Sequence, residues 1–170
     1  TLSGFLGQAN AAPFEALFAR RGFVDAFVRV PGETRSNIKL AEADGRITDL
    51  NGPGPVISAA AQQDLLDRLE QIAHGHDAVV VAGSLPRGVS AQWLHALVLR
   101  LKAKGLRVAL DTSGEALKAC LGAGPWLIKP NTEELAEVLG CAVVSPQAQA
   151  EAANRLHAQG IEHVVISNGA

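Results

Sequence analysis

Four short polar segments each follow an apolar run of strand length. They are residues Gly83 to Gly88, Asp111 to Glu115, Lys129 to Glu134 and Ser167 to Ala170. In open α/β sheets, ligands bind beyond the carboxyl ends of the strands, where such segments would lie. These segments are therefore the first candidates for a ligand-binding site.

The first segment begins with Gly83 and Ser84, directly after the run Val79 to Ala82. A glycine lets the backbone approach a ligand closely, and a serine offers a hydroxyl and an N–H group to an anion. These two residues are candidates for substrate binding. A tight strand-to-helix turn would explain the same residues without any ligand, so both interpretations stay open.

The second segment places Asp111 at a strand end and continues with Thr112 and Glu115. The spacing of Thr112 and Glu115 predicts a capping box at the start of a helix. A carboxylate at the strand end could hold a metal ion through water. Asp111 is therefore a candidate for metal binding, with a purely structural role as the alternative.

The third segment combines Lys129, Asn131 and Glu134. Asn131 and Glu134 have the spacing of another capping box, which alone would explain them. The same groups suit a nucleotide with Mg²⁺, because the lysine and the helix dipole favour phosphate and the carboxylate can orient metal-bound water. The fourth segment, with Ser167 and Gly169, could pass beneath a nucleotide.

Residues 23–51 follow a different pattern. Phe27 to Val30, Ser36 to Ala41 and Arg46 to Leu50 alternate apolar and polar side chains, and Asp44-Gly45 is typical of a hairpin turn. We interpret this stretch as antiparallel, one-sided sheet that forms a small lid.

Arg35 and Asn37 begin one strand of this lid. An arginine that points into a cleft would bind a phosphate or carboxylate through two parallel hydrogen bonds. An isolated surface arginine is usually solvated, so the alternative is that Arg35 has no function.

The rest of the chain alternates between apolar runs and stretches of helical period, which is typical of βαβ units around a parallel sheet. The predicted strands are Asp77 to Gly83, Leu106 to Leu110, Trp126 to Ile128 and His163 to Ile166. The predicted helices lie near Leu65 to Ala73, Trp93 to Leu101, Leu135 to Leu139 and Pro146 to Gln159. The first strand is β-branched and continuous, so we expect it to be covered on both faces. We predict an α/β core at 1–22 and 52–170, with the lid at 23–51.

The composition excludes several classes of protein. Of the 170 residues 48% are hydrophobic and 19% charged, and the formal net charge is -2 with scattered Lys and Arg. A nucleic-acid binder would need a basic face, which this pattern lacks. No apolar stretch is long enough to cross a bilayer and no leader opens the chain, so we expect a cytoplasmic protein. Cys120 and Cys141 lack metal-ligand spacing and are expected to be buried or neutral thiols.

The two ends of the chain are unusual for a complete domain. The chain contains no Met, opens on the apolar run Thr1 to Gly7, and stops directly after a predicted strand. Such a strand still needs neighbours to pair with. We therefore expect a fragment that is incomplete at both ends.

Taken in order, the motifs resemble those of one enzyme family. They are Thr34-Arg35-x-Asn37, Gly83-Ser84-Leu85-Pro86-x-Gly88, Asp111-x-Ser113-x-Glu115-Ala116-Leu117 and Lys129-Pro130-Asn131-x-x-Glu134-Leu135. The series resembles the ribokinase-like carbohydrate kinases of the phosphofructokinase B family, and most of all the bacterial 1-phosphofructokinases. The resemblance covers essentially the whole chain. It implies a three-layer α/β/α core with a small antiparallel β lid.

The resemblance also implies a role for each candidate residue. The sugar phosphate would be bound by Arg35, Asn37, Gly83 and Ser84. ATP would be bound by Lys129, Asn131, Ser167 and Gly169, and Mg²⁺ would be placed by Glu134, Asn131 and Asp111. The expected reaction is transfer of the γ-phosphoryl group of ATP to fructose 1-phosphate, which gives fructose 1,6-bisphosphate.

Parts of the family pattern are missing from this sequence. The Gly-Ala-Gly-Asp motif, whose Asp is the catalytic base of the family, does not occur, and neither do the Asn-Pro-x-x-Asp and Gly-Lys-Gly segments. No catalytic residue is therefore assigned within the chain, and the isolated chain is expected to be inactive. Some relatives dimerise through the lid, so a homodimer is a further expectation.

Two other functions stay open at this point. The parent protein could phosphorylate tagatose 6-phosphate or fructose 6-phosphate, because most residues that contact the sugar lie outside this chain. It could also be a non-catalytic module that binds a sugar phosphate or a nucleotide on the same fold. A Rossmann dehydrogenase is disfavoured, because no G-x-G-x-x-G motif follows a strand.

Overall fold

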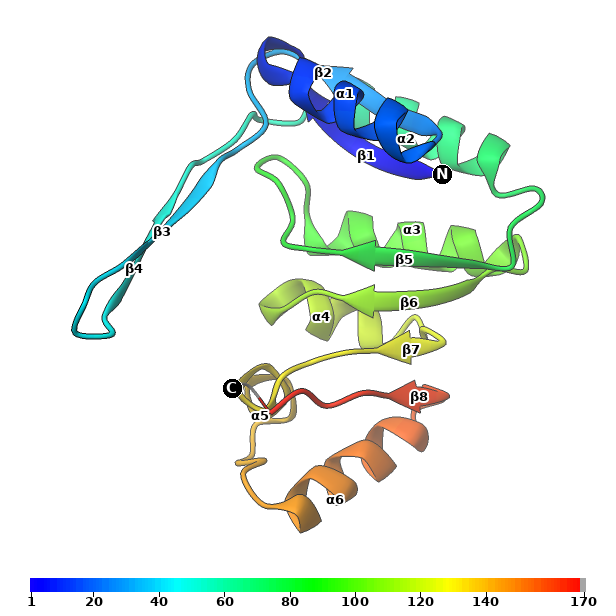
Figure 1. Ribbon diagram of the computed structural model, residues 1–170. Helices are drawn as coiled ribbons and strands as arrows, with labels where there is room; N and C mark the ends of the chain where they lie inside the picture. The colour runs from blue at the N-terminus through cyan, green and yellow to red at the C-terminus, as the bar shows by residue number, and fades with distance from the viewer. Residues whose placement is uncertain (169–170) are drawn as a thin grey trace. The chain divides into compact units, whose positions relative to one another are not determined.

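Residues 1–168 are described by a computed structural model, in which the chain forms two units (Figure 1). The first unit comprises Thr1–Leu69 and Pro86–Gly88. The second comprises Glu70–Leu85 and the chain from Val89 onwards.

The second unit is built on four parallel strands. In spatial order they are β5 (Ala78–Ala82), β6 (Arg107–Asp111), β7 (Leu127–Ile128) and β8 (His163–Val164). All four predicted strands are confirmed, although β7 and β8 are only two residues long. The strands lie side by side in the order in which they follow one another in the sequence, and each is joined to the next by a connection that contains at least one helix.

Helices fill the connections of this sheet. They are α3 (Ala91–Ala103), α4 (Gly114–Leu121), α5 (Thr132–Leu139) and α6 (Pro146–His157), and α2 (Ala59–Ile72) precedes β5. The core lies between α3, α4 and the strands, where Val98, Val108, Leu110, Leu117 and Ile128 are at most 1% exposed. Gly140 ends α5 in the left-handed conformation, as its position in the sequence predicts.

One prediction for this sheet is wrong. The strand β5 was expected to be covered on both faces, but Val80 is 70% exposed. Strand β5 lies at the edge of the sheet, and its exposed residues alternate with half-buried ones along the strand. Only one of its faces is therefore packed within the described residues.

The first unit begins with a parallel pair of strands. Strand β1 (Leu2–Gly7) pairs with β2 (Asp25–Val30), and the short 3-10 helix Gln8–Asn10 and helix α1 (Ala12–Arg21) connect them. The antiparallel pairing predicted for Phe27 to Val30 is therefore wrong, because these residues pair in parallel with the start of the chain. Alternation of apolar and polar residues reveals a one-sided strand but not its direction.

Helix α1 packs its apolar residues against this pair of strands. Leu6, Ala11 and Phe18 are buried, and Leu2, Phe14 and Phe27 pack against them. The rings of Phe18 and Phe27 stack with their centres 5.5 Å apart. This helix is not among the helices predicted from the sequence, although Pro13 in the first turn and the left-handed Gly22 at the end are ordinary helix signals.

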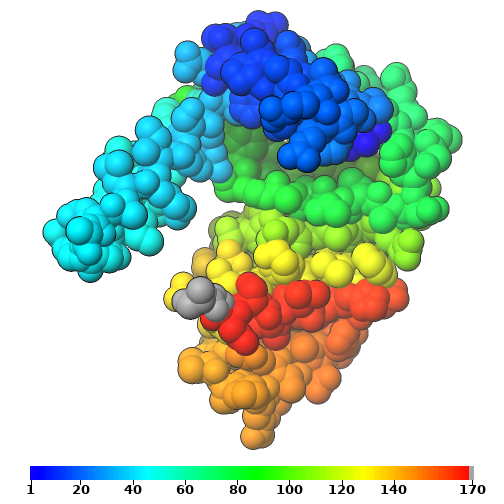
Figure 2. Space-filling model, in the orientation of Figure 1, coloured from blue at the N-terminus to red at the C-terminus, as the bar shows by residue number. Residues whose placement is uncertain are grey.

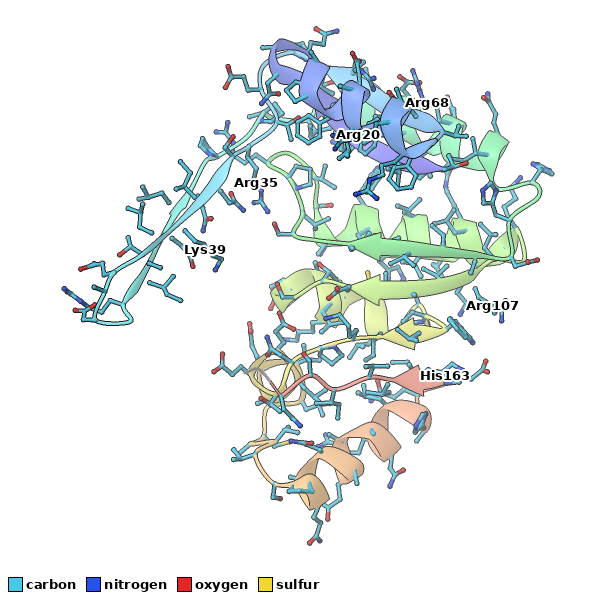
Figure 3. The ribbon with its side chains drawn as sticks, in the orientation of Figure 1. Arg20, Arg35, Lys39, Arg68, Arg107 and His163 are labelled. Carbon is cyan, nitrogen blue, oxygen red and sulfur yellow. The ribbon has the colours of Figure 1, made fainter. Side chains whose placement is uncertain are left out.

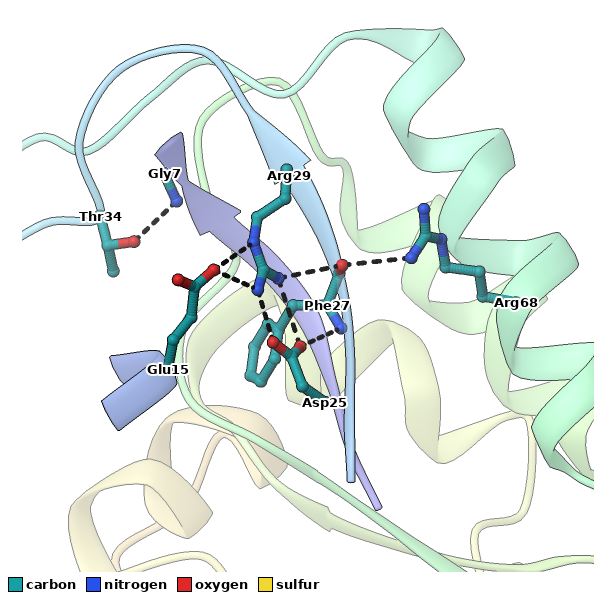
Figure 4. A network of polar contacts seen from close by, with 7 residues as sticks. All are labelled: Gly7, Glu15, Asp25, Phe27, Arg29, Thr34 and Arg68. Carbon is teal, nitrogen blue, oxygen red and sulfur yellow. Dashed lines mark hydrogen bonds and ion pairs between the residues drawn. The ribbon is translucent and has the colours of Figure 1, made fainter. Parts of the chain in front are cut away.

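The side of the pair that faces α1 also carries a charged network (Figure 4). Arg29 of β2 donates hydrogen bonds to Asp25 and to Glu15 of α1, with shortest distances of 2.5 and 2.7 Å. The hydrogen bond between Arg29 and Asp25 lowers the pKa of the Asp25 carboxyl. The same hydrogen bond raises the pKa of the Arg29 guanidinium. Arg68 of α2 donates to the carbonyl oxygen of Phe27 at 3.3 Å.

The predicted hairpin is confirmed. Strands β3 (Asn37–Ala41) and β4 (Ile47–Asn51) are antiparallel, and the turn contains Asp44 and Gly45. All ten strand residues are exposed, and the hairpin projects from the first unit as a narrow arm, coloured cyan in Figure 2. The division into a core at 1–22 and 52–170 and a lid at 23–51 stays a prediction.

The two cysteines lie in different environments. Cys120 is buried, and burial raises the pKa of its thiol to about 11. Cys141 is exposed, so burial is confirmed only for Cys120. Among residues 1–168, the helices are all too short or too polar to span a membrane.

Candidate active site

The candidate residues of the second unit meet at one edge of its sheet. The register pairs Ala82 with Asp111, and the N–H of Gly83 donates to the carbonyl oxygen of Asp111 at 2.8 Å. The N–H of Lys129 donates to the carbonyl oxygen of Leu110 at 3.0 Å. The carboxyl ends of β5, β6 and β7 are thus hydrogen-bonded side by side, as expected for parallel strands.

Lys129 and Asp111 form an ion pair across this edge. The Nζ atom of Lys129 lies 3.1 Å from a carboxylate oxygen of Asp111, and both side chains are nearly half exposed. The sequence suggested separate roles for the two residues, near phosphate and near metal. The structure brings them together, so a cation and a carboxylate face solvent at the same point.

The helix α5 begins beside this pair with the predicted capping box. The N–H of Glu134 donates to Oδ1 of Asn131 at 2.8 Å, and the N–H of Asn131 donates to Oε2 of Glu134 at 2.9 Å. This structural interpretation of the two residues is therefore confirmed. The box uses one oxygen of the Glu134 carboxylate, which leaves its other oxygen available for a water molecule or a ligand.

The segment after β8 runs alongside the start of α5. Ser167 forms a parallel bridge with Asn131, and its N–H donates to the carbonyl oxygen of Pro130 at 3.0 Å. The candidate Ser167 thus lies beside the candidate Asn131. Gly169, the other predicted residue of this turn, lies outside the described residues.

The capping box predicted at Thr112 is wrong. Helix α4 begins after Ser113, whose side chain makes no capping hydrogen bond. Thr112 is only 7% exposed, and its hydroxyl has no hydrogen-bond partner among residues 1–168. Thr112 lies between the end of β6 at Asp111 and Ser113, the residue before α4, and its side chain is buried there instead of capping the helix.

No preformed metal cage exists in the described part of the chain. Residues 1–168 contain no group of three His, Cys, Asp or Glu side chains close enough to hold a metal ion. Mg²⁺ usually binds proteins through one or two carboxylates and takes its other ligands from water and substrate phosphates. Asp111 and Glu134 could bind Mg²⁺ in that way, together with water and phosphate oxygens. They do not form a site that encloses the ion with protein ligands alone.

The substrate candidates Arg35 and Asn37 belong to the first unit. Arg35 lies at the base of the hairpin (Figure 3). Arg35 lines a cavity of about 440 Å³ formed by Pro31 to Ser36 and Gly52 to Val56. Asn37 pairs with Asn51 as the first rung of the hairpin. Ser84 belongs to the second unit and is exposed directly after Gly83, whose φ of 94° favours glycine.

Thr34 has no role predicted from the sequence. Its hydrogen bonds hold the chain in place directly before Arg35. Its hydroxyl accepts a hydrogen bond from the N–H of Gly7 at 2.8 Å, and Asn10 binds both its N–H and its carbonyl oxygen. A Cβ atom on Gly7 would lie 2.2 Å from the backbone nitrogen of Thr34, so only glycine fits there. No local signal links residues so far apart in sequence.

The whole chain, residues 1–170, matches the family described as pfkB family carbohydrate kinase. The chain belongs to this family. It is 41% identical over 170 residues to a 1-phosphofructokinase of Vibrio cholerae and 42% identical over 171 residues to one of Escherichia coli. Both alignments cover 100% of this chain, which confirms the resemblance to 1-phosphofructokinases.

Solved structures of the pfkB family have the same fold. Phosphofructokinase-2 from E. coli in complex with fructose-6-phosphate is 30% identical and superposes with a TM-score of 0.87 over 98% of this chain. The tetrameric inhibited form of the same enzyme superposes with a TM-score of 0.82 at 29% identity. The predicted ribokinase-like α/β fold is confirmed. The chain spans about half the length of these relatives, 54% of the curated ones and 56% of the solved ones.

Proposed function

We propose that this chain is part of an ATP-dependent kinase that converts fructose 1-phosphate to fructose 1,6-bisphosphate. The observation that carries the proposal is the edge where Asp111, Lys129 and the capped start of α5 lie together. Phosphoryl transfer depends on positioning and on neutralising phosphate charge. A cation, two carboxylates and a helix N-terminus at one sheet edge suit that task.

The nucleotide would lie at this edge. Lys129 and the N-terminus of α5 would attract the phosphates of ATP, and Ser167 lies beside Asn131 where the chain could pass under the nucleotide. Mg²⁺ would be placed through water by Glu134, Asn131 and Asp111, since no cage of ligands is needed for it. When bound, MgATP supplies the phosphoryl group that is transferred.

The sugar phosphate would be bound by the other candidates. Arg35 lines the cavity at the base of the hairpin, and a guanidinium can bind a phosphate through two parallel hydrogen bonds. Gly83 and Ser84 would offer backbone and hydroxyl groups to the same phosphate, and Asn37 would support it from the hairpin. No residue of this chain is assigned as the catalytic base.

The hairpin also suggests a partner. Ile38, Leu40 and Leu50 lie on one face of the hairpin and are each about half exposed. A two-stranded hairpin with an uncovered apolar face is only marginally stable in water. We infer that a second copy of the protein covers this face, which would make the parent protein a homodimer.

An ADP-release assay with MgATP tests the proposed function. Fructose 1-phosphate, fructose 6-phosphate and tagatose 6-phosphate are compared as acceptors, with this chain and with the product of the complete reading frame. Turnover of fructose 1-phosphate by the complete product, with none by this chain, would support the proposal. Preference for another acceptor would change the substrate, and turnover of none would favour a binding module.

The role of Arg35 is tested in the same assay. Arg35→Met should raise the KM for the sugar phosphate roughly tenfold or more, because a charged hydrogen-bonding partner of the phosphate is lost. Arg20→Met is the matched control, since Arg20 lies in the exposed last turn of α1 (Figure 3). An unchanged KM in Arg35→Met would remove Arg35 from the substrate site.

A further inference from the structure

Backbone hydrogen bonds attach the loop Pro86–Gly88 to the rest of the first unit, of which it is a part. The N–H of Ile57 donates to the carbonyl oxygen of Arg87 at 2.8 Å. The side-chain amide of Gln62 donates to the carbonyl oxygens of Gly88 and Ile57 at 3.0 and 3.2 Å. A Cβ atom on Gly88 would lie 2.6 Å from the oxygen of Ile57, so the two backbones touch.

The side chain of Arg87 extends this attachment to a second place. Its Nη2 atom donates to the carbonyl oxygen of Gly54 at 2.6 Å. Gly54 lies in the segment Gly52 to Pro55, through which the chain returns from the hairpin. The backbone of Arg87 thus binds Ile57, and its side chain binds the return segment at Gly54.

This return segment lies directly against Arg35. A Cβ atom on Gly54 would be 3.3 Å from Cβ of Arg35, and the N–H of Gly52 donates to the carbonyl oxygen of Ser36 at 3.0 Å. The same two segments line the cavity at the base of the hairpin. Gly54 and Arg35 therefore lie close together within the first unit.

We propose that Arg87 is a positioning residue for the sugar-phosphate site. It holds the return segment of the hairpin, and through Gly54 it fixes Arg35 in place. Arg87 follows Ser84 by three residues in the sequence, but all the contacts that carry this inference lie within the first unit. This inference rests on the proposed function for its effect on kinetics, but the attachment itself does not.

The first test measures the attachment by hydrogen–deuterium exchange in this chain. Arg87→Met should make the amides of residues 34–36, Gly52 and Gly54 exchange roughly fivefold faster, because one hydrogen bond is lost. Exchange at residues 57–62 should not change, because the backbone bonds of the loop remain. Arg100→Met is the matched control, since Arg100 is an exposed arginine paired with Glu70 at 3.3 Å. Unchanged exchange of the Gly52 and Gly54 amides in Arg87→Met would overturn the inference, independently of any kinetic result.

The second test measures kinetics in the product of the complete reading frame. Arg87→Met should raise the KM for the sugar phosphate about fivefold and leave kcat and the KM for ATP within about twofold. Arg87→Lys, which keeps a cationic donor, should restore most of the loss. Faster exchange with an unchanged KM would overturn the positioning role. Faster exchange in a protein that phosphorylates no sugar would instead overturn the proposed function and leave the attachment intact.

Discussion

At the scale of single residues, Lys129 and Asp111 are the most informative pair. Each neutralises the other at 3.1 Å, yet both remain nearly half exposed to solvent. An ion pair this exposed contributes little to stability, typically below about 1 kcal/mol. The pair therefore adds little to the stability of the fold, and it lies at the carboxyl ends of the strands, where the nucleotide is proposed to bind.

The first prediction concerns Lys129. In the product of the complete reading frame, Lys129→Met should raise the KM for ATP about tenfold, because a phosphate loses a cationic partner. The KM for the sugar phosphate should stay constant, as measured by steady-state ADP release. Lys104→Met, at the end of α3, is the control. Equal effects on both substrates would argue against a nucleotide role for Lys129.

The second prediction concerns the buried hydroxyl of Thr112. Because this group has no partner among residues 1–168, Thr112→Val should leave the free energy of unfolding unchanged or raise it by about 1 kcal/mol. Urea denaturation of the two proteins measures the difference. A loss of stability would mean that the hydroxyl is hydrogen-bonded to an internal water molecule in solution.

At the scale of elements, helices α4 and α5 begin in different ways. Helix α5 starts with a complete capping box, whereas Ser113 before α4 makes no side-chain hydrogen bond. Capping side chains satisfy N–H groups that the first turn leaves without partners. The start of α5 should therefore be the more rigid of the two.

The third prediction compares these two caps. Asn131→Ala should lower the free energy of unfolding by about 1 kcal/mol, because the hydrogen bond from the N–H of Glu134 to the Asn131 side chain is lost. Ser113→Ala should change it by less than about 0.5 kcal/mol, since no capping bond exists to lose. Urea denaturation again gives both values. Equal losses in the two variants would contradict the difference between the caps.

The fourth prediction concerns the charged network between α1 and β2 (Figure 4). Arg29 lowers the pKa of Asp25 below its ordinary value of 3.8. The folded state therefore favours the ionised carboxylate, and this contribution to stability is complete above the ordinary pKa. It is lost as the pH falls through the lowered pKa of the folded state.

Thermal unfolding at a series of pH values checks this expectation. The difference in Tm between the wild type and Asp25→Asn should be largest near about pH 7 and should shrink below about pH 4. Asp77→Asn, at an exposed position of the second unit, is the control. A difference that grows toward acid would reverse the sign and contradict the network.

At the scale of the whole molecule, the exposed apolar surfaces are the main feature. The hairpin exposes Ile38, Leu40, Ile47 and Leu50, and the edge strand β5 exposes Val80. Soluble monomers rarely expose contiguous apolar patches, which usually mark an interface.

The fifth prediction separates the hairpin from the rest of this surface. In the product of the complete reading frame, Ile38→Glu should convert a dimer to a monomer, because it buries a charge in the proposed interface. Light scattering after gel filtration measures the mass. Glu42→Gln, near the tip of the hairpin, is the control. A monomeric wild type, or a dimer that survives Ile38→Glu, would place any interface elsewhere.

Local signals in the sequence determined much of this protein. The cap at Asn131, the stop at Gly140 and the turn at Asp44-Gly45 were predicted because each depends on residues within a few positions. The motifs and their order along the chain also predicted the family correctly, because both can be read from the sequence without any tertiary contact. The four parallel strands of the second unit followed from their apolar runs.

Only the tertiary structure decided the contacts between distant segments. The parallel pairing of β2 with β1, the ion pair of Lys129 with Asp111 and the attachment of Arg87 to Gly54 each join residues far apart in sequence. The pattern of side chains along a strand fixes which face is buried, but it does not fix which neighbour the strand pairs with. That choice depends on the packing of the whole sheet and its helices, which no local window contains.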